Sequence, residues 1–166
     1  EEPDRVPYHL GYTIAMRRKL EEHLGTTDLD SLFDDHLAAY SMRRMAPGEE
    51  VRPGFWKDDF GAVWNRTIDK DIGVVEEYQL KDRDASAVNL PDPRDPRRFA
   101  LLPAFIAANR DRFRLVNHGF ALFERAWILR GMDQVLIDMI EAPEFADALL
   151  DRILEFNLAV VDEICR

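Results

Sequence analysis

The stretch FRLVNHGFALFERAWILRG, residues 113–131, decides the fold. Phe113, Leu115 and Val116 form a short apolar run that suits a buried strand. Gly119 then permits a sharp turn, because it has no Cβ. From Phe120 to Trp127 apolar residues recur at helical spacing, and Gly131 is placed to end the helix. We therefore predict one strand, a glycine turn and one helix that is apolar around most of its circumference.

The turn of this unit is where functional groups are expected. In parallel α/β barrels the C-terminal ends of the strands carry the chemistry, which here indicates Asn117, His118 and the start of the helix. Glu124 and Arg125 are charges within an apolar helix, so each must find water, a partner or a cavity. The alternative interpretation is that His118 is a hydrogen-bonded structural histidine and Glu124 a surface carboxylate.

The chain resembles the uroporphyrinogen decarboxylase family, which includes the decarboxylases of haem biosynthesis and the methyltransferases that demethylate methyl-corrinoids. The order and spacing of several short motifs carry the resemblance. They are Arg5-Val6-Pro7, Asp59-Phe60-Gly61-Ala62-Val63-Trp64, Leu90-Pro91-Asp92-Pro93, Gly119-Phe120, Phe123-Glu124-Arg125-Ala126-Trp127, Leu129-Arg130-Gly131-Met132, Leu136, Asp138-Met139, Pro143-Glu144, Leu149-Leu150 and Ile153. They span nearly the whole chain but match only the N-terminal half of such a protein.

Members of this family are single (β/α)8 barrels, and a complete barrel has roughly 250 residues. The chain has 166 residues, enough for one hydrophobic core. The fold expected from the resemblance is α/β: the N-terminal half of a TIM (β/α)8 barrel, with extra N-terminal helices and a small antiparallel β-ribbon insertion. We expect residues 1–166 to form a single domain that is a fragment of a longer barrel.

A first strand is predicted over residues 6–10, with Tyr8 and His9 near its C-terminal end as substrate-binding residues. The alternative is that both lie at the edge of the core. In the family's decarboxylases an Arg-Gln-Ala-Gly-Arg motif follows this strand and holds substrate carboxylates. Here that place reads Leu10-Gly11-Tyr12-Thr13, so the resemblance implies a substrate other than uroporphyrinogen.

Two helices are predicted next, over residues 13–24 and residues 28–40. Thr13 is a candidate N-cap and Gly25 ends the first helix. In the second helix apolar residues recur at i, i+3 and i+4, and His36 lies on that face as a half-buried structural residue. The resemblance implies a functional aspartate near here, for which Asp35 is the nearest candidate.

From residue 49 to residue 80 the pattern changes to short strands joined by tight turns. We predict antiparallel ribbons, with turns at residues 58–61 and 71–73. Asp59 and Trp64 belong to an aromatic and acidic cluster that either packs over the barrel or forms a flap over a pocket.

A proline-rich loop follows over residues 81–98. Asp95 is predicted to cap the next helix, and Pro103 should kink or restart that helix. A short helix over residues 133–141 and, after Ala142-Pro143, a last helix with an apolar side from Phe145 to Ile164 complete the chain.

The sequence therefore nominates eight site residues. Trp127 stands where the decarboxylases have a substrate-facing tyrosine, which again suggests a different ligand, because an indole donates but does not accept. The catalytic candidates are Asp59, His118 and Glu124, and the substrate-binding candidates are Tyr8, His9, Trp64, Phe120 and Trp127. No residue is nominated as a metal ligand, and no cofactor is expected within these 166 residues.

Charge and composition limit the partners. The net charge of −10 and the pI of about 4.9 argue against nucleic acid, because neutralising phosphates requires a basic face. The single cysteine, Cys165, provides neither a disulfide framework nor a thiolate cluster for zinc. No apolar run is long enough for a membrane span. We expect a cytoplasmic protein with a small-molecule substrate, and possible homodimers through exposed barrel edges.

Three functions follow from the resemblance and the residues. The first is the N-terminal part of a carbon–carbon lyase acting on a carboxylated substrate, which needs an acid, a stabilising carboxylate and arginines but no cofactor. The second is a methyl-corrinoid methyltransferase, whose zinc ligands would lie in the family's C-terminal half. The third is a non-catalytic half-barrel that binds a partner or self-associates. We expect the isolated chain to be inactive as an enzyme.

Overall fold

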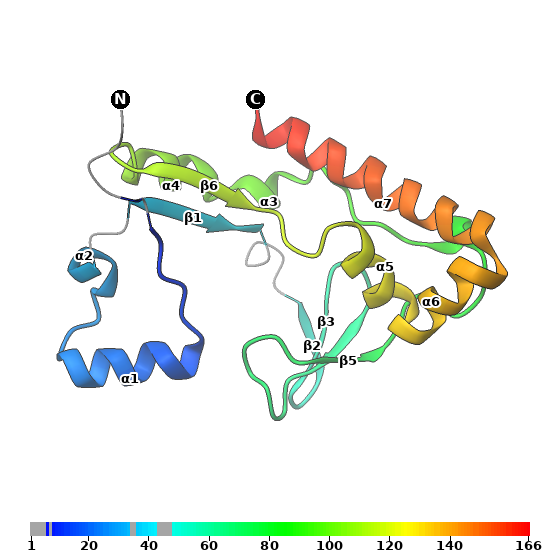
Figure 1. The fold of residues 1–166 in the computed structure, drawn as a ribbon, viewed down its shortest axis with the longest axis horizontal. Helices are drawn as coiled ribbons and strands as arrows, with labels where there is room; N and C mark the ends of the chain where they lie inside the picture. Colours follow the sequence, from blue (N-terminus) through cyan, green and yellow to red (C-terminus); the bar gives the residue numbers. More distant parts are fainter. Residues whose placement is uncertain (1–5, 7, 34–35, 43–47) are drawn as a thin grey trace. The chain divides into compact units, whose positions relative to one another are not determined.

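A computed structural model describes residues 6, 8–33, 36–42 and 48–166, with the side chain of residue 30 outside the description. The chain divides into two compact units. The first contains residues 1–41 and 101–117, and the second contains residues 42–100 and 118–166. Each unit is described by itself (Figure 1). The expectation of a single domain over residues 1–166 stays a prediction.

The first unit begins with the predicted helix. Helix α1, Ile14–Leu24, is capped by the hydroxyl of Thr13, which accepts a hydrogen bond from the backbone N–H of Met16 over 3.2 Å. The helix ends at Gly25, as expected. A short helix α2, Leu29–Phe33, follows, and its Ser31 N–H donates to the Asp28 carboxylate over 3.2 Å.

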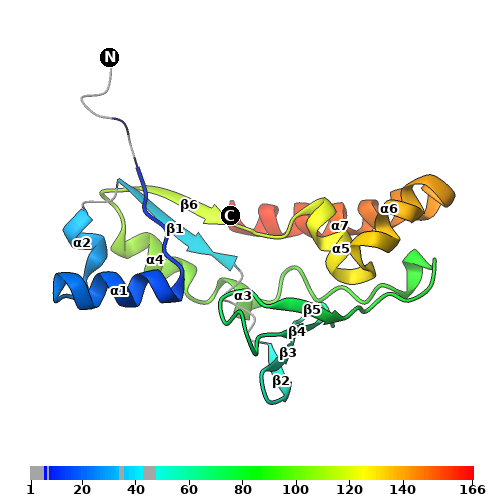
Figure 2. The same cartoon turned by 60° about the horizontal axis from the view of Figure 1, so that its bottom comes forward.

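Two parallel strands complete this unit. Strand β1, Leu37–Ser41, pairs with β6, Phe113–Asn117, from Leu37 opposite Phe113 to Ser41 opposite Asn117. The two strands lie side by side in Figures 1 and 2. Helix α4, Leu102–Ala108, packs beside them, with the ring of Phe105 at 5.1 Å from the ring of Tyr40. The predicted strand at the start of the 113–131 stretch is therefore confirmed, but the prediction that it is buried is wrong, because Phe113 is 67% exposed and Leu115 41% exposed.

Two predictions in this unit are wrong. Residues 37–41 form a strand instead of the second half of a helix, because Ala38 and Tyr40 alternate into the core once β6 supplies a partner. Short apolar runs fit both periodicities, and only the distant partner decides between them. Val6 and residues 8–10 lie in no strand, so Tyr8 and His9 do not stand at a strand end. Asp35 lies outside the described residues.

In the second unit an antiparallel sheet confirms the predicted ribbon (Figure 2). The sheet has the order β2-β3-β4-β5. Its strands are β2, Glu49–Arg52; β3, Phe55–Lys57; β4, Val63–Asn65; and β5, Val74–Glu77. Trp64 and Val75 lie opposite each other on one face and join a buried cluster with Ala62 and Ile128. This face therefore packs against the helix that carries Ile128.

The loop after the sheet contains a 3₁₀ turn, η2, Ala85–Ala87, and a short helix α3, Pro96–Phe99. The carboxylate of Asp95 accepts a hydrogen bond from the Arg97 N–H over 2.9 Å, which confirms the predicted cap. Pro103 lies in the first turn of α4, where a proline costs no backbone hydrogen bond. The predicted restart at this residue is also confirmed.

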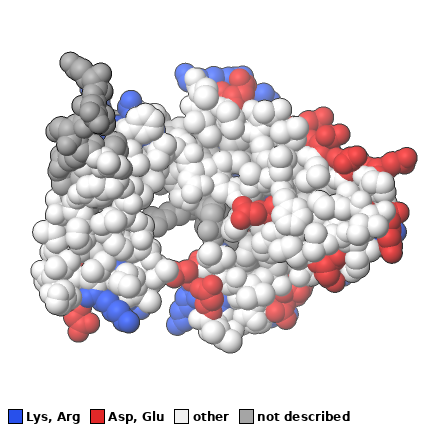
Figure 3. Space-filling view, viewed as in Figure 1, with Lys and Arg blue, Asp and Glu red and all other residues white. Residues whose placement is uncertain are grey.

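Three helices end the second unit: α5, Leu122–Arg130; α6, Met132–Glu141; and α7, Pro143–Ile164. Gly131 has a φ of 99° and connects α5 directly to α6. Helix α7 buries residues spaced three and four apart, as its sequence predicts: Ala146, Leu149, Ile153, Phe156 and Val160. Acidic side chains form several separate patches on the visible surface around α6 and α7, mostly along its edge (Figure 3).

The described residues therefore form a mixed α/β structure, as predicted, with one parallel strand pair and one antiparallel sheet. They contain no closed barrel. Among the helices of the described part of the chain, none has both the length and the apolar character that a membrane crossing requires.

Candidate functional site

The candidate site is a group of aromatic and charged side chains around Phe60 in the second unit, which we call the Phe60 cluster. Its members are Asp58, Asp59, Phe60, Trp64, Arg98, Phe120, Arg125 and Phe156. These residues come from the sheet, the turn after β3, α3, the glycine turn and two helices. The fold thus brings distant parts of one unit to a single aromatic ring.

Asp58 organises the turn that presents Phe60. Its Oδ1 accepts hydrogen bonds from the backbone N–H groups of Phe60, over 3.0 Å, and Ala62, over 2.9 Å. Its Oδ2 accepts from the Trp64 indole Nε1–H over 2.9 Å. Aspartate carboxylates commonly stabilise turns in this way, by replacing backbone acceptors. The Trp64 contact is additional and ties β4 to the turn.

Arg125 is the buried cation of the cluster. Its guanidinium carbon lies 3.6 Å from the centroid of the Phe60 ring, and its Nη1 lies 3.6 Å from Oδ2 of Asp58. The side chain is only 10% exposed. A guanidinium over an aromatic face is attracted by the ring quadrupole, and the attraction is stronger where water is excluded. Arg125 is therefore held between an aromatic face and a carboxylate.

Phe120 forms the second aromatic wall. Its ring stacks on Trp64 with centroids 5.6 Å apart, and the Arg125 guanidinium lies 5.6 Å from it. Phe120 has a φ of 37°, in the left-handed region that residues with a side chain rarely adopt. Such strain persists only where surrounding contacts maintain it, and it is concentrated at functional sites. The glycine turn thus presents Phe120 in a constrained conformation.

A second arginine, Arg98, also lies near Phe60. Arg98 on α3 forms an ion pair with Asp59, and its guanidinium carbon lies 5.5 Å from the Phe156 ring and 6.0 Å from the Phe60 ring. The Phe60 and Phe156 rings meet edge to face at 5.1 Å. The arginines of two carboxylate–arginine pairs therefore lie near the same Phe60 ring.

His118 borders the cluster through Phe156, with ring centroids 6.3 Å apart. Its Nε2 lies 2.7 Å from Oδ1 of Asn157 and donates to this oxygen when it carries the proton. The other nitrogen, Nδ1, is buried and has no hydrogen-bond partner among the described residues.

The electrostatics of Asp58 differ from those of an ordinary surface carboxylate. Burial raises its pKa, because removal of water disfavours the charged form. The hydrogen bond from Trp64, the charge of Arg125 and the backbone N–H of Ala62 oppose this increase without cancelling it. A carboxyl group with a raised pKa beside a guanidinium is suited to donating a proton to a bound molecule.

The structure places the nominated residues in three kinds of environment. Asp59, Trp64 and Phe120 belong to the Phe60 cluster, and His118 contacts Phe156 at its border. Trp127 is half-buried and packs against the core cluster around Ala62, while Glu124 is exposed on the first turn of α5. Tyr8 and His9 belong to the first unit, which is described separately.

Tyr8 has a local role in the first unit. Its hydroxyl donates to the backbone carbonyl of Phe33, and its ring meets that of His36 edge-on at 4.8 Å. His36 lies just before β1 and not on a helix, so its predicted position is wrong. These contacts hold the residues before α1 against the end of α2.

Five members of the Phe60 cluster were not nominated from the sequence, and neither was Asn157, the partner of His118: the five are Asp58, Phe60, Arg98, Arg125 and Phe156. The sequence did indicate that Arg125 has a special environment, because a charged residue within an apolar helix must find a partner. Asp58 precedes Asp59 in the same turn, and the sequence alone does not decide which of two adjacent carboxylates faces inward. Arg98 and Asn157 join the site through contacts with residues 39 positions away. No local sequence pattern reports such contacts.

A second buried charge cluster lies outside the candidate site. The carboxylate of Asp138, 1% exposed, accepts hydrogen bonds from Arg130 over 2.8 Å and from Arg83 over 2.7 Å. Burial alone would raise its pKa, but the two guanidinium groups lower it. Arg83 also bonds Glu141 over 2.7 Å. This cluster connects the loop after the sheet to α5 and α6.

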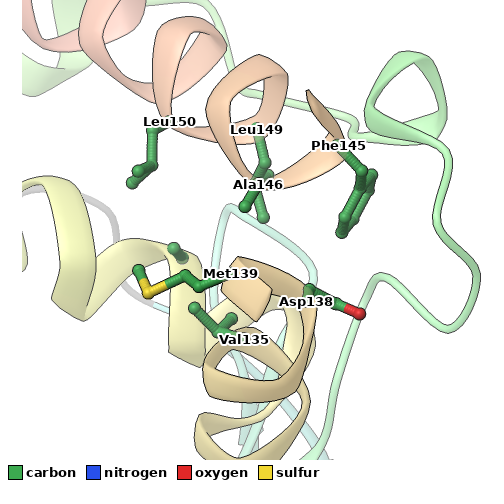
Figure 4. Close-up of a pocket in the computed structure, with 8 residues that line it drawn as sticks. Val135, Asp138, Met139, Phe145, Ala146, Leu149 and Leu150 are labelled. Atoms are coloured by element: carbon green, nitrogen blue, oxygen red, sulfur yellow. The ribbon is translucent and has the colours of Figure 1, made fainter. Parts of the chain in front are cut away.

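The cleft beside Asp138 is packing space and not a ligand pocket. Figure 4 shows Val135 and Met139 of α6 facing Ala146, Leu149 and Leu150 of α7 across it. The space has no room for a water-sized molecule. Within the described residues, no group of three or more histidine, cysteine or acidic side chains is arranged to hold a metal ion.

Comparisons with protein-family models, with curated proteins and with solved structures give no match for this chain.

Proposed function

We propose that this chain supplies the N-terminal half of a uroporphyrinogen decarboxylase-like barrel, which acts as a carbon–carbon lyase on a carboxylated substrate. The parallel pairing of β1 with β6 supports the barrel, since parallel strands are its repeating element. The antiparallel sheet of the second unit is then an insertion that contributes to the site. The motifs that carry the family resemblance include most of the Phe60 cluster.

The observation that carries the functional proposal is the contact between Asp58 and Arg125 on the face of Phe60. A guanidinium is suited to binding a substrate carboxylate, because its planar donors match the two oxygens. A carboxyl group with a raised pKa is suited to donating a proton. Both groups lie within 3.6 Å of each other, beside the stacked rings of Trp64 and Phe120.

The proposed reaction uses these groups in sequence. The aromatic walls bind the apolar part of the substrate, and Arg125 orients one of its carboxylates. The bond between that carboxylate and its carbon breaks, carbon dioxide leaves, and the electron pair stays on the carbon. Asp58 then transfers its proton to that carbon and is reprotonated from water. His118 lies against Phe156 at the edge of the site, and its buried Nδ1 has no hydrogen-bond partner among the described residues.

The test is the release of carbon dioxide by the intact protein that contains this chain, with small aromatic and pyrrole carboxylates as substrates. Asp58→Asn should lower kcat by about 100-fold or more, because general acid catalysis contributes that much. Glu144→Gln, on the exposed first turn of α7, serves as the control and should leave the rate unchanged. Near-ultraviolet circular dichroism checks that both variants are folded.

The outcomes separate this proposal from its competitors. An unchanged rate in a folded Asp58→Asn variant removes Asp58 from the mechanism. Zinc-dependent demethylation without any decarboxylation would replace the lyase by a methyltransferase. Decarboxylation by residues 1–166 alone would contradict the proposal that the site needs the rest of a barrel.

A further inference from the structure

A groove of about 350 Å³ lies on the antiparallel sheet of the second unit, lined by Lys57 of β3, Val63 of β4 and Glu77 of β5 among others. These three residues are register partners across the sheet. Residues one apart in a strand point to opposite faces, so the groove lies opposite the face on which Trp64 packs. It is therefore a different surface from the Phe60 cluster.

One ion pair crosses the groove. Arg52 and Glu77 come from the two outer strands of the sheet, β2 and β5, and their side chains approach to 3.4 Å. The guanidinium of Arg52 also lies 3.9 Å from the centroid of the Phe55 ring. Neighbouring strands are about 4.8 Å apart, so an ion pair between the outer strands spans the sheet. Arg52 is thus anchored on an aromatic ring and a carboxylate.

The remaining charges of the groove are positive. Lys57 and Lys81 line it, and the structure gives neither lysine side chain an ion pair among the described residues. The lining also includes Tyr78, whose hydroxyl is a potential donor. With Arg52, the described lining has three cations and one carboxylate, in a chain of net charge −10. A local excess of positive charge in a strongly acidic protein is a selective attractor for anions.

We propose that this groove binds a small molecule that carries two anionic groups, either carboxylates or phosphates. Its volume is within the range of about 300–1,000 Å³ that small-molecule sites occupy. Lys57 and Lys81 bind the anionic groups, while Val63 forms an apolar floor and Tyr78 donates a hydrogen bond. The site needs neither the Phe60 cluster nor the proposed lyase activity. Each of the two proposals can therefore be tested, and refuted, independently of the other.

The test is a calorimetric titration of the 166-residue chain with inorganic pyrophosphate and, separately, with citrate, at low salt and at matched ionic strength. The double variant Lys57→Gln/Lys81→Gln should weaken binding at least 10-fold. Lys70→Gln is the matched control, because Lys70 is an exposed lysine of the same unit that does not line the groove. The backbone amide signal of Gly61, which lines the groove, should shift on titration in a ¹H–¹⁵N correlation spectrum.

Saturable binding that the double variant loses and the control retains supports the proposal. Binding of pyrophosphate alone assigns the ligand to the phosphates, and binding of citrate alone assigns it to the carboxylates. Absence of saturable binding to both probes overturns the proposal. An equal loss in the control and the double variant also overturns it, because that result reports only nonspecific attraction.

Discussion

The indole Nε1–H of Trp64 donates to the carboxylate of Asp58 over 2.9 Å, and this bond joins strand β4 to the turn that follows β3. The same carboxylate oxygen lies 3.6 Å from Arg125 of helix α5. One oxygen thus links the sheet, its turn and the helix behind it. The stability of the candidate site should depend on this oxygen more than on any contact of Glu124, which is exposed.

Asp58 and Trp64 should show energetic coupling in a double-mutant cycle. In Asp58→Asn an amide N–H group would face the indole donor, and Trp64→Phe removes that donor. We expect a coupling free energy of about 1–2 kcal/mol, typical of a partly buried hydrogen bond to a charged group. Urea unfolding measures it, followed through Trp56 and Trp127, which remain in every variant and lie in the second unit. Additive effects within about 0.3 kcal/mol would mean that the bond contributes no stability.

Asp138 should make the second unit sensitive to acid. Because its pKa is lowered in the folded state, its stabilising contribution is complete above the unfolded pKa of about 3.9. This contribution is lost as pH falls through the lower, folded-state pKa. At neutral pH we expect Asp138→Asn to cost on the order of 3 kcal/mol, because it leaves buried Arg130 without its carboxylate.

The difference between wild type and Asp138→Asn should therefore shrink as pH is lowered from 6 to about 2, in line with the direction of that shift. Asp133→Asn, an exposed position in the first turn of the same helix, is the control. Urea midpoints measured at each pH follow both variants. A difference that stays constant over this range would contradict the assigned pKa direction.

Gly73 should tolerate a methyl group less well than Gly61. Both glycines have a φ of 84°, so alanine is strained at either position, by roughly 1–2 kcal/mol. A Cβ at Gly73 would also lie 2.6 Å from the backbone oxygen of Asn65, whereas at Gly61 it meets the side-chain amide of Gln79 at the longer distance of 3.3 Å. Gly73→Ala should have the lower melting temperature. Equal melting temperatures of the two variants would show that the loss of stability comes from the backbone conformation alone, and not from the contacts of the added Cβ.

Arg152 should hold the loop after the sheet against helix α7. Its guanidinium donates to the backbone carbonyls of Ala85, Ser86 and Val88 over 3.0–3.2 Å. Arg152→Lys cannot form this fork, and we expect a loss of about 1–3 kcal/mol because the carbonyls lose charge-assisted donors. Arg97→Lys, at an 88% exposed side chain, is the control.

Hydrogen exchange provides the local measurement for Arg152→Lys. Amides in the 3₁₀ turn η2, Ala85–Ala87, should exchange faster in the variant, while amides in the middle of α7 should be unaffected. If exchange in η2 is unchanged, the loop is held by its own contacts, such as the Asp84 carboxylate that accepts from the Ser86 N–H.

The sequence predicts the elements whose causes are local. Thr13 caps α1, Asp95 caps α3, and Pro103 lies at the start of α4, because each contact is made within a few residues. The regular spacing of apolar residues also identifies α7 along its length. Strand β1 was read as helix because its partner β6 is far away in the chain, and an alternating pattern of five residues is too short to decide.

The candidate site likewise has residues that the sequence indicates and residues that only long-range packing brings in. Trp64 and Phe120 were nominated as substrate-binding residues, and the structure stacks their rings, while their binding role stays a prediction. The choice of Asp59 over Asp58 could not be made from the sequence, since the two differ in the direction that the turn gives them. Asp59 pairs with Arg98, whereas Asp58 faces Trp64 and Arg125. The packing of the folded chain determines which way each carboxylate points, and this direction cannot be predicted from the composition of the turn.

The pairing of β1 with β6 has a consequence for the order of events during synthesis on the ribosome. When Leu37–Ser41 leaves the exit tunnel, its partner Phe113–Asn117 has not yet been translated. The hairpins of β2–β5 connect neighbouring segments and are complete long before that. Strand β1 therefore remains without this partner on the nascent chain while the residues of the antiparallel sheet are synthesised. During this interval the unpaired edges of β1 are where a chaperone would bind.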